Sequence, residues 1–391
     1  MSEVSIVGWA HTPFGKHEND DAESLIAAVG RSAIEDAGLA PADIDAVFVG
    51  MFNSGMNKQD FPSSLLLRSV PELRYKPMTR LENACASGSA AIHGGRDFLR
   101  AGRGRFALVV GVEKMTGNTT AAVGDALLGA SYRREEGDIP AGFAGVFARM
   151  AQSYFQKHGD QSDALATIAA KNHKNGVDNP YAQMRKDLGF AFCSTVSDKN
   201  PLVAAPLRRT DCSPISDGAA ALVLAIDDEA DAFPRAVRFR AAVQANDFLP
   251  LSERDQTRLE GAERAWGAAY AAAGVSLDDL SFVEVHDCFT IAELMAYEAM
   301  GLAAPGRGGS AALDGTTAAD GRLPVNRSGG LKAKGHPVGA TGVSMHVMSA
   351  MQLTGEAGAL QLPKADLAGV FNMGGSGVAN YVSILEPVRR A

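Results

Sequence analysis

A gapless internal repeat constrains the fold of this 391-residue chain more than any other feature of its sequence. Residues 37–50 (AGLAPADIDAVFVG) align with residues 273–286 (AGVSLDDLSFVEVH), and an alanine-rich segment precedes each stretch. Each copy is typical of a helix that ends at glycine, followed by a short loop and an apolar strand. The identical positions in the first copy are Ala37, Gly38, Asp43, Val47 and Val49. We therefore predict two similar α/β halves, each layered around a mostly parallel or mixed sheet.

A second pair of segments follows the repeat in the same order. Residues 83–91 (NACASGSAA) and residues 334–342 (KGHPVGATG) are both rich in small residues. Each segment is placed where a strand or loop would lead into a helix. Cys85 and His336 therefore occupy comparable places in the two copies, and we expect functional loops to gather between the halves.

A third correspondence indicates a long insertion in the first half. Residues 371–386 (FNMGGSGVANYVSILE) predict one continuous strand, turn and strand, whereas the counterparts in the first copy are separated, at 107–116 and 216–227. Such a long connection is usually functional. The polar insertion carries several cations, among them Lys171, Lys174, Arg185 and Lys186. We expect three units: an N-terminal half of residues 1–116 and 213–230, an inserted loop domain of residues 117–212, and a C-terminal half of residues 231–391.

Charge and hydropathy exclude several classes of protein. The net charge is -8 and the pI about 5.5, which argues against a nucleic-acid-binding protein, because phosphate neutralisation needs a clustered basic surface. No run of roughly 18 apolar residues predicts a membrane helix, and the first residues lack the pattern of a secretion signal. We therefore expect a cytoplasmic protein that spans no membrane. The four cysteines form no CxxC pair, so we expect free thiols and no metal site.

Cys85 is the strongest candidate for a nucleophile. It stands just before a predicted helix, where free N–H groups and the positive end of the helix dipole favour a thiolate. Cysteine is more often a small buried hydrophobe that serves packing. The small neighbours from Ser87 to Ala91 leave the sulfur accessible to a substrate, which favours the catalytic interpretation.

His336 is the matching candidate for a general base. Glycines at 335 and 339 and the proline after it fix the imidazole near a helix start. A lone histidine is more often structural or exposed. The correspondence with Cys85 across the repeat favours a base that takes the thiol proton.

Two more segments place polar groups near the same predicted site. HDCF at 286–289 follows an apolar strand, so His286 and Cys288 are expected at the mouth of a sheet, where ligands bind in open α/β folds. Gly374, Gly375 and Gly377 form a tight turn near the C-terminus. The N–H groups of this turn either stabilise an oxyanion or belong to a turn that a hairpin requires, and the sequence favours neither interpretation.

These motifs resemble those of the thiolase superfamily and, within it, of the sterol-carrier-protein-type thiolases. NACASGSAA, HDCF and GHPVGATG resemble the three catalytic loops of that family, and the resemblance spans nearly the whole chain. Ordinary thiolases have an asparagine loop where this chain has His286. They also have a second catalytic cysteine where this chain has GVFNMGGSG. Further matching segments are NPYAQMRKD (179–187), SPISDGAAA (213–221) and VNRSGGLKAKGHP (325–337).

The resemblance implies a five-layered α/β/α/β/α core, a loop domain over the substrate, and a homodimer or homotetramer. It implies no metal or redox cofactor, because coenzyme A and acyl-CoA enter as substrates. It also implies that Ser213 lies beside the pantetheine arm. We further predict that the inserted segment 117–212, with its lysines and arginines, among them Lys171 and Lys174, covers the coenzyme A tail. The expected activity is thiolytic cleavage of a 3-oxoacyl-CoA or the reverse Claisen condensation.

The resemblance further implies a role for each site residue. Cys85 carries the acyl group, and His336 accepts its proton. His286 and His336 stabilise the enolate, and Cys288 transfers the proton that the missing second cysteine would transfer. The backbone N–H of Cys85 and one from the turn at Met373 and Gly374 form a second oxyanion site.

Two other functions remain open from the sequence. A decarboxylating ketoacyl synthase would also use Cys85 with two histidines, but it leaves Cys288 without a role. A thiolase-like retro-aldolase or binding subunit with a small OB-fold partner would leave Cys85 itself without a role.

Overall fold

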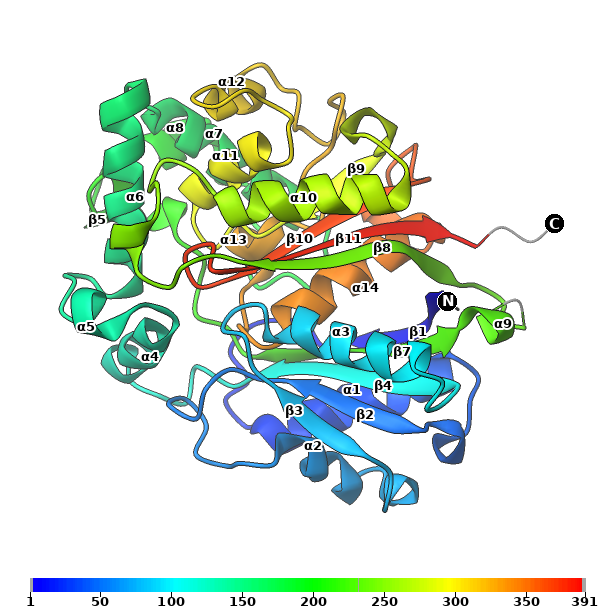
Figure 1. Cartoon of the computed structure of the whole chain (residues 1–391). Coiled ribbons are helices and arrows are strands. Elements are labelled where there is room, and N and C mark those ends of the chain that lie inside the picture. Colours follow the sequence, from blue (N-terminus) through cyan, green and yellow to red (C-terminus); the bar gives the residue numbers. More distant parts are fainter. Residues whose placement is uncertain (1–2, 231, 389–391) are drawn as a thin grey trace.

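The computed structural model describes residues 3–230 and 232–388, and its centre is a mixed sheet of nine strands (Figure 1). The strands hydrogen bond in the order β3-β2-β4-β7-β1-β8-β11-β10-β9, so the first five belong to the N-terminal half and the last four to the C-terminal half. The strands are β1 (Val4–His11), β2 (Ala46–Gly50), β3 (Met78–Leu81), β4 (Phe106–Glu113), β7 (Gly218–Ile226), β8 (Val237–Asn246), β9 (Phe282–Val285), β10 (Ala368–Gly374) and β11 (Ala379–Pro387).

The helices include seven of ten or more residues. These are α1 (Ala22–Asp36), α3 (Ser87–Arg100), α6 (Phe143–His158), α7 (Ser162–Gly176), α10 (Glu260–Ala273), α11 (Thr290–Ala299) and α14 (Thr341–Leu353). The shorter helices are α2 (Pro62–Leu65), α4 (Thr120–Leu127), α5 (Arg133–Glu136), α8 (Gly189–Ser194), α9 (Asp227–Ala230), α12 (Gly308–Leu313) and α13 (Gly330–Lys334).

The repeat corresponds to equivalent units of structure. The first copy consists of the end of α1 and strand β2, and the second consists of the end of α10 and strand β9. Gly38 and Gly274 follow the two helices with φ of +72° and +63°, the left-handed conformation that glycine adopts without strain. Strands β4 and β7 pair antiparallel in the first half, as β10 and β11 do in the second.

The elements form five layers, as predicted (Figure 1). Helix α1 covers the outer face of the N-terminal strands, and α10 covers the outer face of the C-terminal strands. Helices α3 and α14 lie between the two groups of strands. The groups are joined where β1 pairs with β8, through Ser5 with Arg238 and Ile6 with Val237.

Small residues allow α3 and α14 to meet at their N-terminal ends. A Cβ added at Gly88 would lie 2.9 Å from the Gly339 carbonyl oxygen, and one at Gly342 would lie 2.4 Å from the Ser89 nitrogen. Real Cβ atoms do not approach so closely, so both positions require glycine. The small-residue segments around Cys85 and His336 therefore bring these two residues together.

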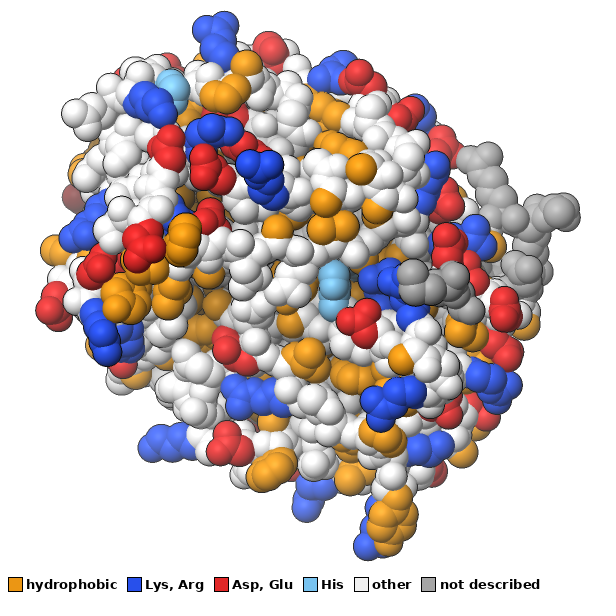
Figure 2. All heavy atoms as spheres, in the orientation of Figure 1, with side chains coloured by type: hydrophobic (Ala, Val, Ile, Leu, Met, Phe, Trp, Pro, Cys, Tyr) orange, Lys and Arg blue, Asp and Glu red, His pale blue; other side chains and the backbone are white. Residues whose placement is uncertain are grey.

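The segment between β4 and β7 contains α4 to α8 and a short hairpin of β5 (Leu202–Ala204) and β6 (Leu207–Arg208). It occupies the left side of Figure 1, beside the turn that joins β10 to β11. On the face shown in Figure 2, basic and acidic side chains are interspersed. Within residues 3–230 and 232–388, no helix combines the length and the apolar character needed to cross a membrane.

Candidate active site

Cys85 lies in the loop between β3 and α3, two residues before the helix begins. The preceding residue, Ala84, has a φ of +51°, an uncommon conformation for a residue with a side chain. Cys85 is only 2% exposed. The turn after β10 packs against this loop, because a Cβ at Gly374 would lie 2.3 Å from the Asn83 carbonyl oxygen.

The hydrogen bonds of His336 leave one ring nitrogen ready to accept a proton. The Thr341 hydroxyl donates to the Pro337 carbonyl oxygen at 3.0 Å and lies 2.7 Å from His336 Nδ1. With that hydroxyl proton on the Pro337 carbonyl oxygen, we assign Nδ1–H as the donor in the second contact. His336 Nε2 is therefore the unprotonated nitrogen, which is the form that a general base needs.

In His286 the proton is on the other ring nitrogen, Nε2, and Asn372 determines this tautomer. The Asn372 Nδ2 group donates to the Cys85 carbonyl oxygen at 3.2 Å, and its Oδ1 accepts from Ser89 at 2.7 Å, so the orientation of the amide is fixed. The same Nδ2 group lies 2.9 Å from His286 Nδ1, which must accept. The proton is then on His286 Nε2, which is buried and has no protein partner among the described residues. A buried N–H without a partner is suited to an oxygen that acquires negative charge.

The structure places Cys85, His286 and His336 close together. One ligand atom from each lies within 4.8 Å of the others, and the imidazole rings are 5.0 Å apart at 85°. The same spacing would suit a metal ion. A metal would need an unprotonated nitrogen from His286, however, and Asn372 already occupies Nδ1 and keeps the proton on Nε2.

Cys288 and Ser213 lie in the same site. Cys288 is 3% exposed, in the loop from β9 to α11, and its carbonyl oxygen accepts from the Ser213 N–H at 2.9 Å. A pocket of about 240 Å³, here called the cysteine pocket, is lined by both residues and by Cys85 and His336. The inserted segment closes its other side with Phe143, Ala144 and Val203, among other residues.

Burial keeps all four candidate site residues, the two cysteines and the two histidines, uncharged at neutral pH. It raises the pKa of the Cys85 thiol to about 12, although the Gly375 N–H lowers it. Burial, followed by the positive charge of Lys334, lowers the pKa of His336 to about 3. It also lowers the pKa of His286, with a further contribution from His336. The pKa of Cys288 lies well above its usual value because of burial and then the nearby Cys85.

These shifts correct one expectation about Cys85. The sequence analysis expected the N–H groups at the helix start to favour a thiolate, but desolvation disfavours the charged form more strongly than those groups favour it. The thiol of Cys85 is therefore protonated at neutral pH, and it would need a base to become a nucleophile.

Asp287 connects two of the catalytic loops. Its carboxyl group accepts from the backbone N–H groups of Leu331 at 2.6 Å and Lys332 at 3.1 Å, and from Asn172 at 2.8 Å. Gly330 makes this approach feasible, because a Cβ there would lie 2.3 Å from the carboxyl group. Asp287 thus holds the loop of His286 against the segment that leads to His336.

The turn after β10 is a hairpin turn that also packs against the Cys85 loop. Met373 is fully buried in β10 and pairs with Asn380 of β11, so the turn is a hairpin. Gly374 packs on the Cys85 loop, whereas Gly375 supplies the N–H that acts on the thiol.

Lys171 does not face a ligand, contrary to the expectation that it contacts coenzyme A. Its ammonium group donates to Glu293 at 2.8 Å and to the Val325 carbonyl oxygen at 2.7 Å. Lys174, in the last turn of α7, is exposed.

Sequence reasoning missed two residues that set the protonation of the histidines. Asn372 is a buried amide in the apolar strand β10, and a polar residue in such a strand was a usable signal. Thr341 lies five residues after His336 at the start of α14, where nothing distinguished it from a helix-start threonine. Glu284, in β9, is also buried and accepts a hydrogen bond from the Ser328 hydroxyl.

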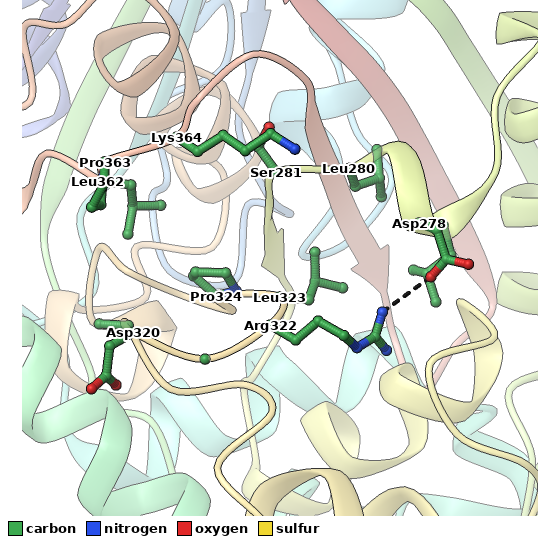
Figure 3. Close-up of a pocket in the computed structure, with 13 residues that line it drawn as sticks. Asp278, Leu280, Ser281, Asp320, Arg322, Leu323, Pro324, Leu362, Pro363 and Lys364 are labelled. Atoms are coloured by element: carbon green, nitrogen blue, oxygen red, sulfur yellow. Dashed lines mark hydrogen bonds and ion pairs between the residues drawn. The ribbon is translucent and has the colours of Figure 1, made fainter.

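A separate hollow of about 420 Å³ lies near the start of β9, whereas the HDCF loop follows the end of that strand (Figure 3). Arg322 and Asp278 at its rim form an ion pair at 3.1 Å. None of the predicted site residues lines it. It is therefore not part of the active site.

Two family models match the sequence. The thiolase N-terminal domain matches residues 4–228, and a thiolase C-terminal domain-like model matches residues 244–387. The acetyl-CoA acetyltransferase of Methanothermobacter thermautotrophicus is 38% identical over 99% of this chain and all of that protein. Sterol carrier protein 2 of Oryctolagus cuniculus is 30% identical over 97% of this chain and 71% of that protein.

Solved structures have the same fold. An aldolase described as Ltp2-ChsH2(DUF35) has a TM-score of 0.83 at 20% identity and covers 99% of this chain and 98% of that chain. The duplicated α/β core and its paired cysteine and histidine loops define a class of acyl-transferring enzymes. The relatives indicate the same class. The chain belongs to the thiolase family. It is a thiolase-type acyltransferase that uses coenzyme A thioesters as substrates.

Proposed function

We propose that the enzyme cleaves 3-oxoacyl-CoA thiolytically, or runs the reverse condensation, through an acyl group on Cys85. The observation that carries this proposal is the cluster of Cys85, His286 and His336, with one ligand atom from each within 4.8 Å of the others. In the cleavage direction, His336 Nε2 accepts the thiol proton while the sulfur attacks the 3-keto carbon. The bond between the α-carbon and this carbon then breaks.

The electron pair of the broken bond moves to the acetyl-CoA enolate. Two N–H groups then face the enolate oxygen, Nε2–H of His286 and the newly protonated Nε2–H of His336. Donors that are already oriented stabilise developing charge without reorganisation, which is their main catalytic advantage. Cys288 gives its proton to the α-carbon and releases acetyl-CoA.

The second half-reaction regenerates the enzyme. The Cys288 thiolate takes the thiol proton of an incoming coenzyme A, whose sulfur attacks the acyl group on Cys85. The backbone N–H groups of Cys85 and of the turn at Met373, Gly374 and Gly375 stabilise the tetrahedral oxyanion. The Cys85 sulfur leaves and recovers its proton from His336.

We also propose that the 117–212 segment covers the pantetheine arm beside Ser213 and that the enzyme is a homodimer or homotetramer. A small OB-fold partner is a further proposal, prompted by the DUF35-containing aldolase with the same fold. Cys288 in the cysteine pocket favours the thiolase reaction over a decarboxylating ketoacyl synthase, which has no use for that thiol.

The test is to locate the acyl group. We expect incubation of the full chain with acetyl-CoA, without any partner, to place one acetyl group on Cys85 by peptide mass analysis. Cys85→Ala should acquire none. An adduct found only on Cys193 or Cys212 would refute the assignment, and acylation that requires an added OB-fold protein would favour the binding-subunit alternative.

A further inference from the structure

A second pocket adjoins the cysteine pocket. Its volume is about 430 Å³, within the range typical of ligand sites. The segment from Cys212 to Ile215 lines both pockets, so one stretch of chain forms their common wall. The neighbouring walls of the second pocket are apolar and include Met184, Leu188 and Phe192.

The charge of this second pocket is opposite to that of the chain. Lys332, Lys199 and Arg209 line it, and no aspartate or glutamate does. The whole chain, in contrast, has a net charge of -8. Lys199 and Arg209 are exposed, whereas Lys332, in α13, is 4% exposed. The pocket therefore has two cations at its rim and one within.

The buried ammonium group of Lys332 has no partner within the described parts of the chain. The ammonium group forms neither a hydrogen bond nor an ion pair there, although the charges of Asp287 and Asp211 favour its protonated form from a distance. Other donors occupy both of these carboxyl groups. Asp211 is held by Arg208 at 2.8 Å and by Thr290 at 2.8 Å. A buried cation without a partner is costly, so the site is complementary to an anion.

His173 adds a second polar group to the same pocket. It is fully buried, and neither ring nitrogen has a hydrogen bond of standard geometry to the described residues. The Lys186 backbone nevertheless lies close enough to oppose the lowering of the His173 pKa by burial. Burial lowers the pKa of Lys332 as well, and an anion in the pocket would oppose that shift.

We propose that this pocket binds a carboxylate at the far end of the acyl chain, so that the enzyme accepts dicarboxylic acyl-CoA substrates. The inference rests on the proposed thiolase reaction at Cys85. The backbone N–H of Lys332 donates to Asp287, the residue before Cys288, at 3.1 Å. Its ammonium group interacts electrostatically with Cys212, which lines both pockets. The phosphates of coenzyme A are separated from its sulfur by the whole pantetheine arm, which favours an acyl carboxylate over a phosphate as the anion.

Binding to the Cys85→Ala variant tests the proposal without any chemistry. Hexanedioyl-CoA and hexanoyl-CoA have the same chain length and differ by one terminal carboxylate. Calorimetric titration should show the dicarboxylic thioester binding on the order of 10- to 100-fold more tightly, as for a hydrogen bond between charged groups. Adding Lys332→Met to this variant should abolish the preference.

A second pair of changes covers the case in which Lys332→Met does not fold. Lys199→Ala and Arg209→Ala alter exposed rim cations, and each should reduce the preference by about 2- to 5-fold, less at high salt. Equal affinity for the two thioesters in the Cys85→Ala protein would overturn the proposal. The proposal would also be overturned if Lys332→Met weakened the binding of both thioesters equally and if this loss of affinity disappeared with 3′-dephospho-CoA derivatives. The pocket would then bind the coenzyme phosphate. Failure of the proposed reaction would appear separately, as absence of the acyl group on Cys85.

Discussion

Replacing His286 with alanine tests the role of its unpartnered Nε2–H. The change removes one donor aimed at the enolate oxygen. Asn372 keeps its bonds to the Cys85 carbonyl oxygen and to Ser89, so the neighbouring loop retains its support. Loss of one such donor typically lowers the rate about 10²- to 10³-fold, or roughly 2.7–4 kcal/mol.

The assay compares two steps that depend on different donors. Exchange of the acetyl-CoA methyl protons with deuterated water requires the enolate and should fall in His286→Ala by that factor. Transfer of the acetyl group to Cys85 uses the other oxyanion site and should change much less. Both are measured by mass spectrometry on the same protein.

His346→Ala is the matched control for the loss of a buried imidazole. Its ring nitrogens contact the Gly342 carbonyl oxygen and Ser383, and none of the candidate catalytic residues. It should lower thermal stability while leaving the exchange rate per folded molecule within a few-fold. If His286→Ala also exchanges at a near-normal rate, or if both of its steps fall equally, the donor assignment is wrong.

Three further predictions concern Cys288 and the two lysines of α7. Cys288→Ala should still acquire a thioester on Cys85 but lose about 10²- to 10⁴-fold in cleavage and in methyl exchange; turnover within a few-fold of wild type would identify Cys288 as a packing residue. Lys171→Ala breaks a buried ion pair with Glu293 and should destabilise the fold by about 3–5 kcal/mol in denaturant unfolding. Lys174→Ala, its exposed neighbour, should leave stability unchanged and raise KM for acyl-CoA if the inserted segment covers the coenzyme; an unaltered KM removes this lysine from the site.

The sequence predicted the features that depend on local pattern. The repeat indicated equivalent helix, loop and strand units because each copy has its own glycine stop and apolar run. The same correspondence paired Cys85 with His336, since both precede a helix that must approach another helix closely. The resemblance to thiolases added the role of Cys288, which no spacing in the chain would have indicated.

Features that depend on tertiary contacts were not predictable. The resting protonation of Cys85 depends on how completely later segments bury it, and helix-start arguments alone gave the wrong sign. The direction in which the Lys171 side chain points depends on its ion pair with Glu293, which lies 122 positions further along the chain. Asn372 determines which nitrogen of His286 carries the proton, although the two residues come from different strands and loops.

The duplication also has an evolutionary consequence. A symmetric pair of identical halves would place two equivalent helix starts face to face, with the same residue at each. Once both copies belong to one chain, each position can mutate independently, so one can keep a cysteine and the other a histidine. Neither half alone contains both a nucleophile and its base. A gene fragment that encodes a single half would therefore lack activity even if it folded, and selection on the reaction preserves the linkage of the two copies.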